Sequence, residues 1–546
     1  MPASSRTEPN EAAEWKSAAD LAIGLGVQVP TRSLGDVEIS AHDLLELIDI
    51  FFSRFHPQLP FLTGKEQLIR DCVACPLLSW AVVAVAARAS PSLEPIRPRL
   101  VWPIRRLASE SILQPRSLPV IQALLLLCLW PMPYASLIDD PSWMFSGIAT
   151  QKALQLGLSR PFAALMQQTK GDEKAARSLR CTWIACFIVG QMLSDRFGIP
   201  SLVSLEPSVL AAPMPPVLRA VAEAARKDSI ISSLLAQQKP GNGLQSFLPV
   251  LKASESQLES LDTEFGEHES PLLQRLLSSI KLRLYSCALL PNAQDQDAGA
   301  GAESSLHIMS YATKAYTIAM AVINKALEGH DGDTYKIAAT GGGEHSPPRC
   351  ALWTFIDLQS FIMAVFTVLH LVRTYPNLSG QHEVSRISQQ TCSMLHACSV
   401  VEGDHFYRVC EVISYLASKG PNTESSDEDT GAEDAVPTIR PSIGVGVAHK
   451  MIKEAKKRYR SGRRFPEQFP MMDSDGTAVE AESAAGTTPS TDDWLQFPLS
   501  NLVPPAFDMM TWPSWDSGVM FGDNLDAQLP MVDSSTEHPR AHQGLQ

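Results

Sequence analysis

The sequence has no cysteine before Cys72. This absence excludes a zinc site of clustered thiolates in the segment that precedes it. Ten cysteines are spread along the rest of the chain, mostly inside apolar helical patterns. Cys72 and Cys75 form a single C-x-x-C without a second pair nearby, so we interpret them as core thiols. The N-terminus also lacks the basic and then apolar pattern of a secretory signal, and we therefore expect free thiols in a reducing compartment.

The chain shows no stretch with the two-residue period of β-strands, which predicts an all-α fold. Its 546 residues exceed one typical domain, and a hydrophobic content of 45% is sufficient for a sizeable core. The net charge of −14 excludes a protein that coats nucleic acid over its whole surface, but not a small basic module. We expect a disordered segment at residues 1–40 and a large, bundle-like helical domain at residues 41–419.

Motifs for catalysis are missing as well. Asp139 and Asp140 resemble the start of the aspartate-rich motif of terpene cyclases, but no third aspartate follows and no later helix carries a second metal motif. The glycine run at 341–343 lacks the lysine and the preceding strand of a P-loop. His56 has no second metal-type residue at a suitable spacing, so it is interpreted as a helix-end residue. The chain is expected not to be an enzyme, with a helical enzyme of terpene-cyclase type as a minor alternative.

Three helices are predicted between residues 118 and 200. In the first, VIQALLLLCLW, Gln122 is the one strongly polar residue, so this helix should be buried on all sides. The second should end at Gly157, where a left-handed residue closes the last turn. The third carries an apolar stripe that includes Trp183, and its Gly190 should allow another helix to come close.

The order of these helices, with SWMFSGIATQKALQLGLSR between the two others, resembles the central regulatory domain of fungal zinc-cluster transcription factors. The resemblance covers about residues 41–204, with a weaker helical continuation towards Lys419. Its most specific residues are Ser142, Trp143, Gly147, Ala149, Ala153, Gly157 and Leu158. It implies a nuclear regulator of RNA polymerase II transcription that controls a fungal metabolic pathway, for example a secondary-metabolite gene cluster, and that responds to a small-molecule inducer.

The zinc cluster of this family needs six thiolates in two close groups, and no residue of this chain matches them. No cofactor is therefore expected in this chain. Two explanations stay open: the protein regulates without the cluster, or the gene model has lost its first exon. In the first case it would be a co-regulator that reaches DNA by pairing with an intact zinc-cluster factor. Homodimers and heterodimers of this chain both stay open as assemblies.

Residues 351–374 form the most hydrophobic segment of the chain. The segment is long enough to cross a bilayer. However, Asp357 near its start and Gln359 favour a helix buried in the bundle, so no membrane partner is expected.

A linker at residues 420–465 is acidic at first and basic at its end. The basic residues fit a nuclear-import signal, a helix that contacts phosphates, or an ordinary solvated surface, and import is the favoured interpretation. These candidates are Lys450, Lys453, Lys456, Lys457, Arg458, Arg460, Arg463 and Arg464.

The segment at residues 466–546 has no lysine or arginine before Arg540 and combines aspartates with aromatic residues. This composition is typical of disordered activation domains that fold on a coactivator groove. A tail whose aromatic residues pack back onto the helical domain is the alternative. The candidate coactivator contacts are Trp494, Phe497, Phe507, Trp512, Trp515 and Phe521.

Overall fold

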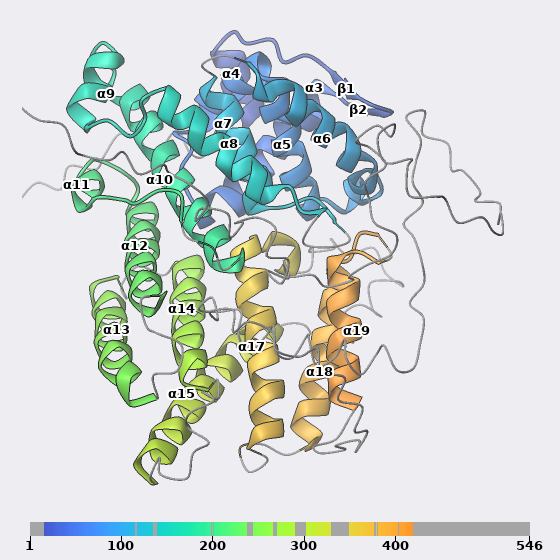
Figure 1. Cartoon of the computed structure of the whole chain (residues 1–546). Helices are drawn as coiled ribbons and strands as arrows, with labels where there is room; N and C mark the ends of the chain where they lie inside the picture. Colours follow the sequence, from blue (N-terminus) through green and yellow to red (C-terminus); the bar gives the residue numbers. More distant parts are fainter. Residues whose placement is uncertain are drawn as a thin grey trace, which may run out of the picture. The chain divides into compact units, whose positions relative to one another are not determined.

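The computed structural model describes residues 16–418 apart from internal gaps, and these residues form a helical fold (Figure 1), as the sequence predicted. The gaps are 115–116, 135–138, 198, 200, 237–243, 266–269, 290–301, 329–348, 376–377, 379–380 and 402. All described residues fall within one compact unit.

The predicted disorder of residues 1–40 is wrong for residues 16–40, which have regular structure. They form α2 (Ala18–Gly24) and an antiparallel hairpin of β1 (Arg32–Leu34) and β2 (Val37–Ile39). The carboxylate of Asp49 accepts two hydrogen bonds from the Ala18 amide, at 3.0 and 2.9 Å, and this anchors α2. Gly35 turns the hairpin with a φ of +61°. Three-residue strands are too short to show an alternating pattern, which explains why the sequence did not reveal them.

The helical domain predicted from residue 41 begins there with a helix whose winding changes along its length. This helix consists of α3 (Ala41–Ile50), a π-helical turn η1 (Phe51–Phe55) and a 3-10 turn η2 (His56–Gln58). The side chain of Ser40 caps its start by accepting a hydrogen bond from the Asp43 amide at 3.1 Å. In the π-helical turn, Phe51 and Phe55 both meet the Trp130 ring edge-on, with centroids 6.5 and 5.6 Å away. This turn therefore joins the first helix to the core.

The first half of the helical unit surrounds one apolar helix, α7. Its elements after η2 are α4 (Lys65–Ala74), α5 (Pro76–Ala86), η3 (Ala87–Ala89), η4 (Pro91–Ile96), α6 (Arg97–Ile112), α7 (Leu118–Leu129), α8 (Ser142–Gln155), α9 (Phe162–Gln168) and α10 (Glu173–Phe197). α7 packs against α5, α8 and α10 and is buried from Val120 to Leu129, as predicted. The amide of Gln122 donates to the Thr182 hydroxyl at 3.1 Å, so the polar group inside this helix is satisfied.

Two glycines lie at the end of α8 and at its contact with α10. Gly157 has a φ of +71° just after α8, in the left-handed conformation expected of a helix end. At Gly190 of α10, an added Cβ would lie 3.8 Å from the Ser146 hydroxyl of α8, an ordinary contact distance, so the helices pack here without requiring a glycine. Trp183 is buried, and the Trp143 ring packs edge-on against Phe197 at 5.9 Å.

The second half is a layer of long helices, which Figure 1 shows below the first half. Its elements are α11 (Pro207–Leu210), α12 (Pro216–Ala236), α13 (Leu244–Phe265), α14 (Pro271–Leu289), α15 (Ala302–Leu327), η6 (Arg349–Leu352), α17 (Phe355–Thr374), α18 (Gln381–Cys398) and α19 (His405–Ser418). α10 packs on α12, and α17 packs on α14, α15, α18 and α19. The Arg283 guanidinium of α14 pairs with the buried carboxylates of Asp195, at 2.9 Å, and Asp228, which ties α14 to α10 and α12.

α17 has the length and apolar composition of a membrane span, with a mean hydropathy of 1.9 over an 18-residue window. However, 89% of that window is buried inside the protein. Its start is fixed by a capping box in which Thr354 and Asp357 bond to each other's backbone amides. The hydroxyls of Ser360 and Thr367 each donate to the carbonyl four residues earlier, at 2.8 Å. α17 is therefore a core helix of this bundle.

Candidate functional site

A cavity of about 320 Å³ lies where the segments after α5 and α7 meet the starts of α17 and α19 and the end of α18. Side chains that line it include Arg88, Arg97, Tyr134, Trp353, Cys398 and His405. Small-molecule sites in proteins have volumes of about 300–1,000 Å³, so this cavity is large enough for a small metabolite. The sequence pattern did not single out these residues, because they come from segments more than 300 positions apart that meet only in the fold.

The wall formed by η6 is held by side chains from the first half of the chain. The carbonyl of Leu352 accepts hydrogen bonds from the Trp130 indole at 3.1 Å and from the Gln58 amide at 2.9 Å. These bonds fix the peptide that leads into Trp353, which lines the cavity. The position of this wall therefore depends on packing around α3 and α7.

Two arginines, Arg88 and Arg97, line the cavity together with Asp404. Arg88 donates to the Pro131 carbonyl at 2.6 Å and to the Trp353 carbonyl at 3.4 Å, so it also connects two of the lining segments. Burial, reinforced by the nearby charge of Arg97, lowers the pKa of Arg88 to about 9. The guanidinium is still protonated at neutral pH, which favours a polar ligand over a purely apolar one.

Tyr134 connects the cavity to the interior of the first half. Its hydroxyl accepts a hydrogen bond from Arg196 at 2.5 Å, and Arg196 forms a buried ion pair with Asp140 at 2.9 Å. Asp140 in turn accepts hydrogen bonds from the Ser142 amide, at 3.0 Å, and the Ser142 hydroxyl, at 2.5 Å. The carboxylate is fully engaged at the start of α8, which argues against a role as a magnesium ligand.

His405, at the start of α19, packs against Tyr134. Its backbone amide donates to the Tyr134 carbonyl at 2.8 Å, and the two rings stack with centroids 5.1 Å apart. Burial, with the charges of Arg196 and Arg408, lowers the pKa of His405 to about 3. The imidazole is therefore neutral under physiological conditions and presents no charge to the cavity.

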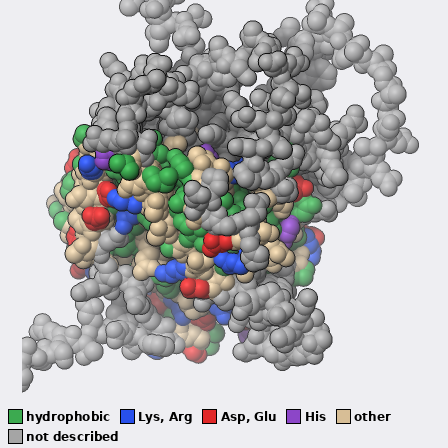
Figure 2. Space-filling view, turned by 90° about the horizontal axis from the view of Figure 1, so that it is seen from below, with side chains coloured by type: hydrophobic (Ala, Val, Ile, Leu, Met, Phe, Trp, Pro, Cys, Tyr) green, Lys and Arg blue, Asp and Glu red, His purple; other side chains and the backbone are tan. Residues whose placement is uncertain are grey.

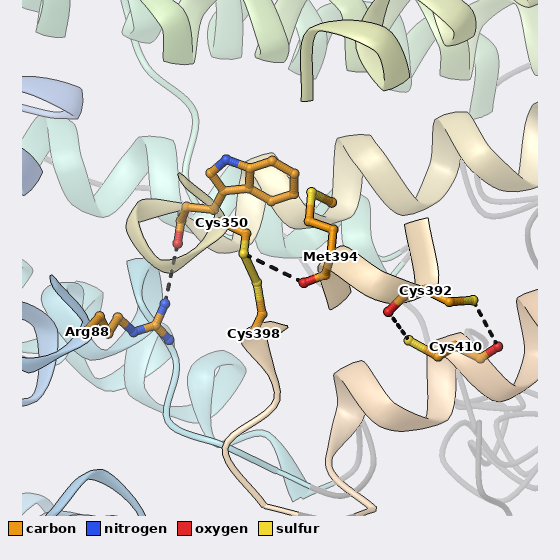
Figure 3. The surroundings of a disulfide bond; sticks show 7 residues. Arg88, Cys350, Cys392, Met394, Cys398 and Cys410 are labelled. Atoms are coloured by element: carbon orange, nitrogen blue, oxygen red, sulfur yellow. Dashed lines mark hydrogen bonds between the residues drawn. A yellow bond between two sulfur atoms is a disulfide. The ribbon is translucent and has the colours of Figure 1, made fainter. Parts of the chain in front are cut away.

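A disulfide between Cys350 and Cys398 closes part of the cavity wall and joins η6 to the end of α18 (Figure 3). The expectation that all cysteines are free thiols is therefore wrong for this pair. The two residues are 48 positions apart in separate apolar patterns, and their pairing depends on how α17 returns the chain. Sequence spacing alone contains no such information.

The described residues offer little for a metal. Cys72 and Cys75 are buried in the core, and burial raises the pKa of both thiols, that of Cys72 to about 12. The imidazole Nε2 of His56 lies 3.0 Å from the Leu62 carbonyl, which fits a helix-end role. In the part of the chain that the structure describes, one group has metal-type spacing, and all of its members are exposed on α3: His42, Asp43 and Glu46.

The two sets of residues that the sequence singled out lie outside the described residues. They are the basic run from Lys450 to Arg464 and the aromatic residues from Trp494 to Phe521. Both interpretations therefore stay predictions. The cavity is a candidate site that the structure reveals and the sequence did not predict.

Comparison with known proteins identifies the helical region. Residues 48–286 match the model of the fungal specific transcription factor domain. This part of the chain, less than half of its length, is similar to that domain. The resemblance inferred from the sequence is thus confirmed. The domain runs from α3 into α14 and includes the buried α7 and the contact between α8 and α10. The cavity lies between this domain and the helices that follow it.

Related proteins are regulators of transcription. The chain is 29% identical over 315 residues to the SEF1 protein of Kluyveromyces lactis, covering 53% of this chain and 26% of that protein. It is 26% identical over 276 residues to the regulatory protein LEU3 of Saccharomyces cerevisiae, covering 45% and 31%. It is 32% identical over 179 residues to the transcriptional regulatory protein SEF1 of Candida albicans, covering 31% and 19%. The chain thus spans less than a third of each of these relatives. No solved structure matches it.

Proposed function

We propose that this protein is a nuclear regulator of RNA polymerase II transcription that controls a fungal metabolic pathway, such as a secondary-metabolite gene cluster. The observation that carries the proposal is the fungal-specific transcription factor domain at residues 48–286. Relatives named as transcription regulators support it. Nuclear fluorescence of the tagged chain tests the location, and a protein that stays cytosolic under all growth conditions would contradict it.

In this proposal the helical unit senses a small polar metabolite in the cavity beside Arg88. The cavity volume and the protonated guanidinium of Arg88 in its lining support this role. Ala397 lines the cavity, so Ala397→Trp should fill it and remove the difference in target-gene expression between inducing and non-inducing media. Leu306→Trp, at an exposed position of α15, is the matched control and should preserve that difference. Equal responses in both variants would exclude the cavity as the sensing site.

The segment at residues 466–546 would recruit a coactivator, and the basic run would direct nuclear import. A reporter fusion of residues 466–546 should activate transcription, and replacing Trp512 and Trp515 with alanine should reduce activation. Alanine at Lys456, Lys457, Arg458 and Arg460 should shift the protein to the cytosol. An inactive fusion, or unchanged nuclear fluorescence, would exclude the respective role.

Two routes to DNA are distinguished by chromatin occupancy. The first route is pairing with an intact zinc-cluster factor, and occupancy should then disappear when that partner is deleted. The second is a zinc cluster encoded upstream of Met1, and an open frame with six suitably spaced cysteines would support it. On the face shown in Figure 2, basic, acidic and apolar side chains of the described residues are interspersed, without the cluster of basic side chains that contact with phosphates needs.

The proposal includes no catalytic step. The terpene-cyclase alternative needs carboxylates that hold magnesium, but Asp140 is committed to Arg196 and Ser142. Magnesium-dependent turnover of a prenyl diphosphate by the purified protein would reinstate the enzyme alternative.

A further inference from the structure

α18 and α19 bring a second pair of cysteines together, Cys392 and Cys410 (Figure 3). Each sulfur lies 3.6 Å from the backbone carbonyl oxygen of the other residue. Both are free thiols. Each side chain therefore reaches the backbone of the other helix, which places the two thiols side by side between α18 and α19.

The two thiols differ in a way that suits an attacking and a resolving residue. Cys392 is half-buried and also lies 3.4 Å from the Ser414 hydroxyl, whereas Cys410 is buried. The contacts of Cys392 with Cys410 and with the Ser414 hydroxyl outweigh burial and lower the pKa of Cys392, which favours its thiolate form. The same contact raises the pKa of Cys410. Cys287 is half-buried too, but burial raises its pKa to about 12.

We propose that Cys392 and Cys410 form a reversible oxidation site for hydrogen peroxide. The Cys392 thiolate attacks the peroxide O–O bond and takes one oxygen as a sulfenic acid, while the other oxygen leaves as hydroxide and is protonated to water. The Cys410 thiol then attacks the Cys392 sulfur, forms the S–S bond and releases a second water. The two thiols lose two electrons in total, and the peroxide gains them. A dithiol reductant restores the two protein thiols by disulfide exchange and is itself oxidised to a disulfide.

The consequence is a covalent link between two helices that line the cavity. α18 is already tied to η6 by the disulfide between Cys350 and Cys398. The second bridge would tie α18 to α19, whose first residue, His405, contacts Tyr134. Oxidation would thus hold the wall that contains Cys398 and His405 in one arrangement. This site is separate from the proposed recognition of a metabolite.

The experiment treats the purified full-length protein with hydrogen peroxide at pH 7 and maps cysteines by mass spectrometry. A peptide containing Cys392 joined to Cys410 should appear, and dithiothreitol should remove it. In Cys410→Ser, oxidation should stop at a sulfenic acid on Cys392 that dimedone traps. In Cys392→Ser, the Cys410 thiol should survive a peroxide dose that oxidises it in the wild type.

Cys287→Ser is the matched control, because it removes another half-buried thiol and should leave formation of the Cys392–Cys410 bridge unchanged. The proposal is overturned if Cys392 stays reduced while other thiols oxidise, or if Cys392 bridges to a different cysteine. Both readouts are chemical, so they are independent of any transcriptional activity.

Discussion

Asp140 is the residue on which the junction of α8, α10 and the cavity depends. It pairs with the buried guanidinium of Arg196 and accepts two hydrogen bonds from Ser142. Breaking a buried ion pair by removing one partner leaves an uncompensated charge and typically costs about 3–5 kcal/mol. We expect Asp140→Asn to lower the free energy of unfolding by about that amount in urea titrations.

The control is Glu173→Gln, which removes an exposed ion pair to Arg177 on α10. An exposed i,i+4 pair contributes only about 0.3–0.5 kcal/mol, so this variant should be nearly as stable as the wild type. Similar losses of unfolding free energy in the two variants would show that the buried pair of Asp140 and Arg196 contributes no more to stability than an exposed pair.

His56 predicts a dependence of stability on pH. Burial lowers its pKa to about 4 in the folded protein, against about 6.5 in an unfolded chain. Between these values the unfolded state binds the proton, so stability is complete above pH 6.5 and falls as the pH drops towards 4. Urea unfolding should show that the wild type loses up to about 3 kcal/mol more than His56→Gln over this range. Parallel curves for the two proteins would contradict this assignment.

At the scale of elements, the stability cost of replacing an apolar side chain depends on whether its helix buries that side chain, as α7 does for residues Val120 to Leu129. Leu125 is fully buried in α7, whereas the Leu306 side chain on α15 is 71% exposed. Replacing a buried leucine with alanine costs about 2–5 kcal/mol, since it leaves a cavity as well as losing apolar contacts. Leu125→Ala should therefore lower the unfolding free energy by this amount, and Leu306→Ala by less than about 0.5 kcal/mol. Circular dichroism during urea unfolding measures both.

The sequence predicted the long helices well because their apolar residues recur with the helical period over many turns. α18 at Gln381–Cys398 and α19 at His405–Ser418 are two such helices, and both lie within the helical domain predicted at residues 41–419. The predictions failed where structure is short or depends on distant contacts. The hairpin at 32–39 is too brief for a period to appear, and η1 obtains its π-helical turn where Phe51 and Phe55 pack on Trp130.

At the scale of the whole molecule, the match to the fungal specific transcription factor domain ends within α14, but the core continues. α15 and α17 pack on α14, and Asp357 of α17 pairs with Arg275 of α14. A chain of residues 16–289 would expose these apolar faces. We expect it to bind the dye ANS and to unfold without a sharp transition, while a chain of residues 16–418 unfolds cooperatively. A sharp transition in the shorter chain would show that the domain is self-sufficient.

The candidate site could not be predicted because it exists only at this scale. Arg88, Tyr134 and His405 lie in three connections or helix ends with no shared motif, and they meet when the two halves of the chain pack together. The same is true of the disulfide at Cys350. Only the polar character of isolated residues in apolar surroundings, such as Asp357 and Gln122, indicated in advance that buried polar contacts exist.

The position of α17 along the chain has a consequence for biosynthesis. α17 is synthesised after α7, α14 and α15, which make most of the contacts that bury its apolar side chains. Since chains begin to fold from the N-terminus during translation, a nascent α17 packs on helices that have already formed and does not stay exposed to solvent. If these twenty residues came first in the chain, they would be synthesised before the helices that bury them, which would favour aggregation or insertion into a membrane.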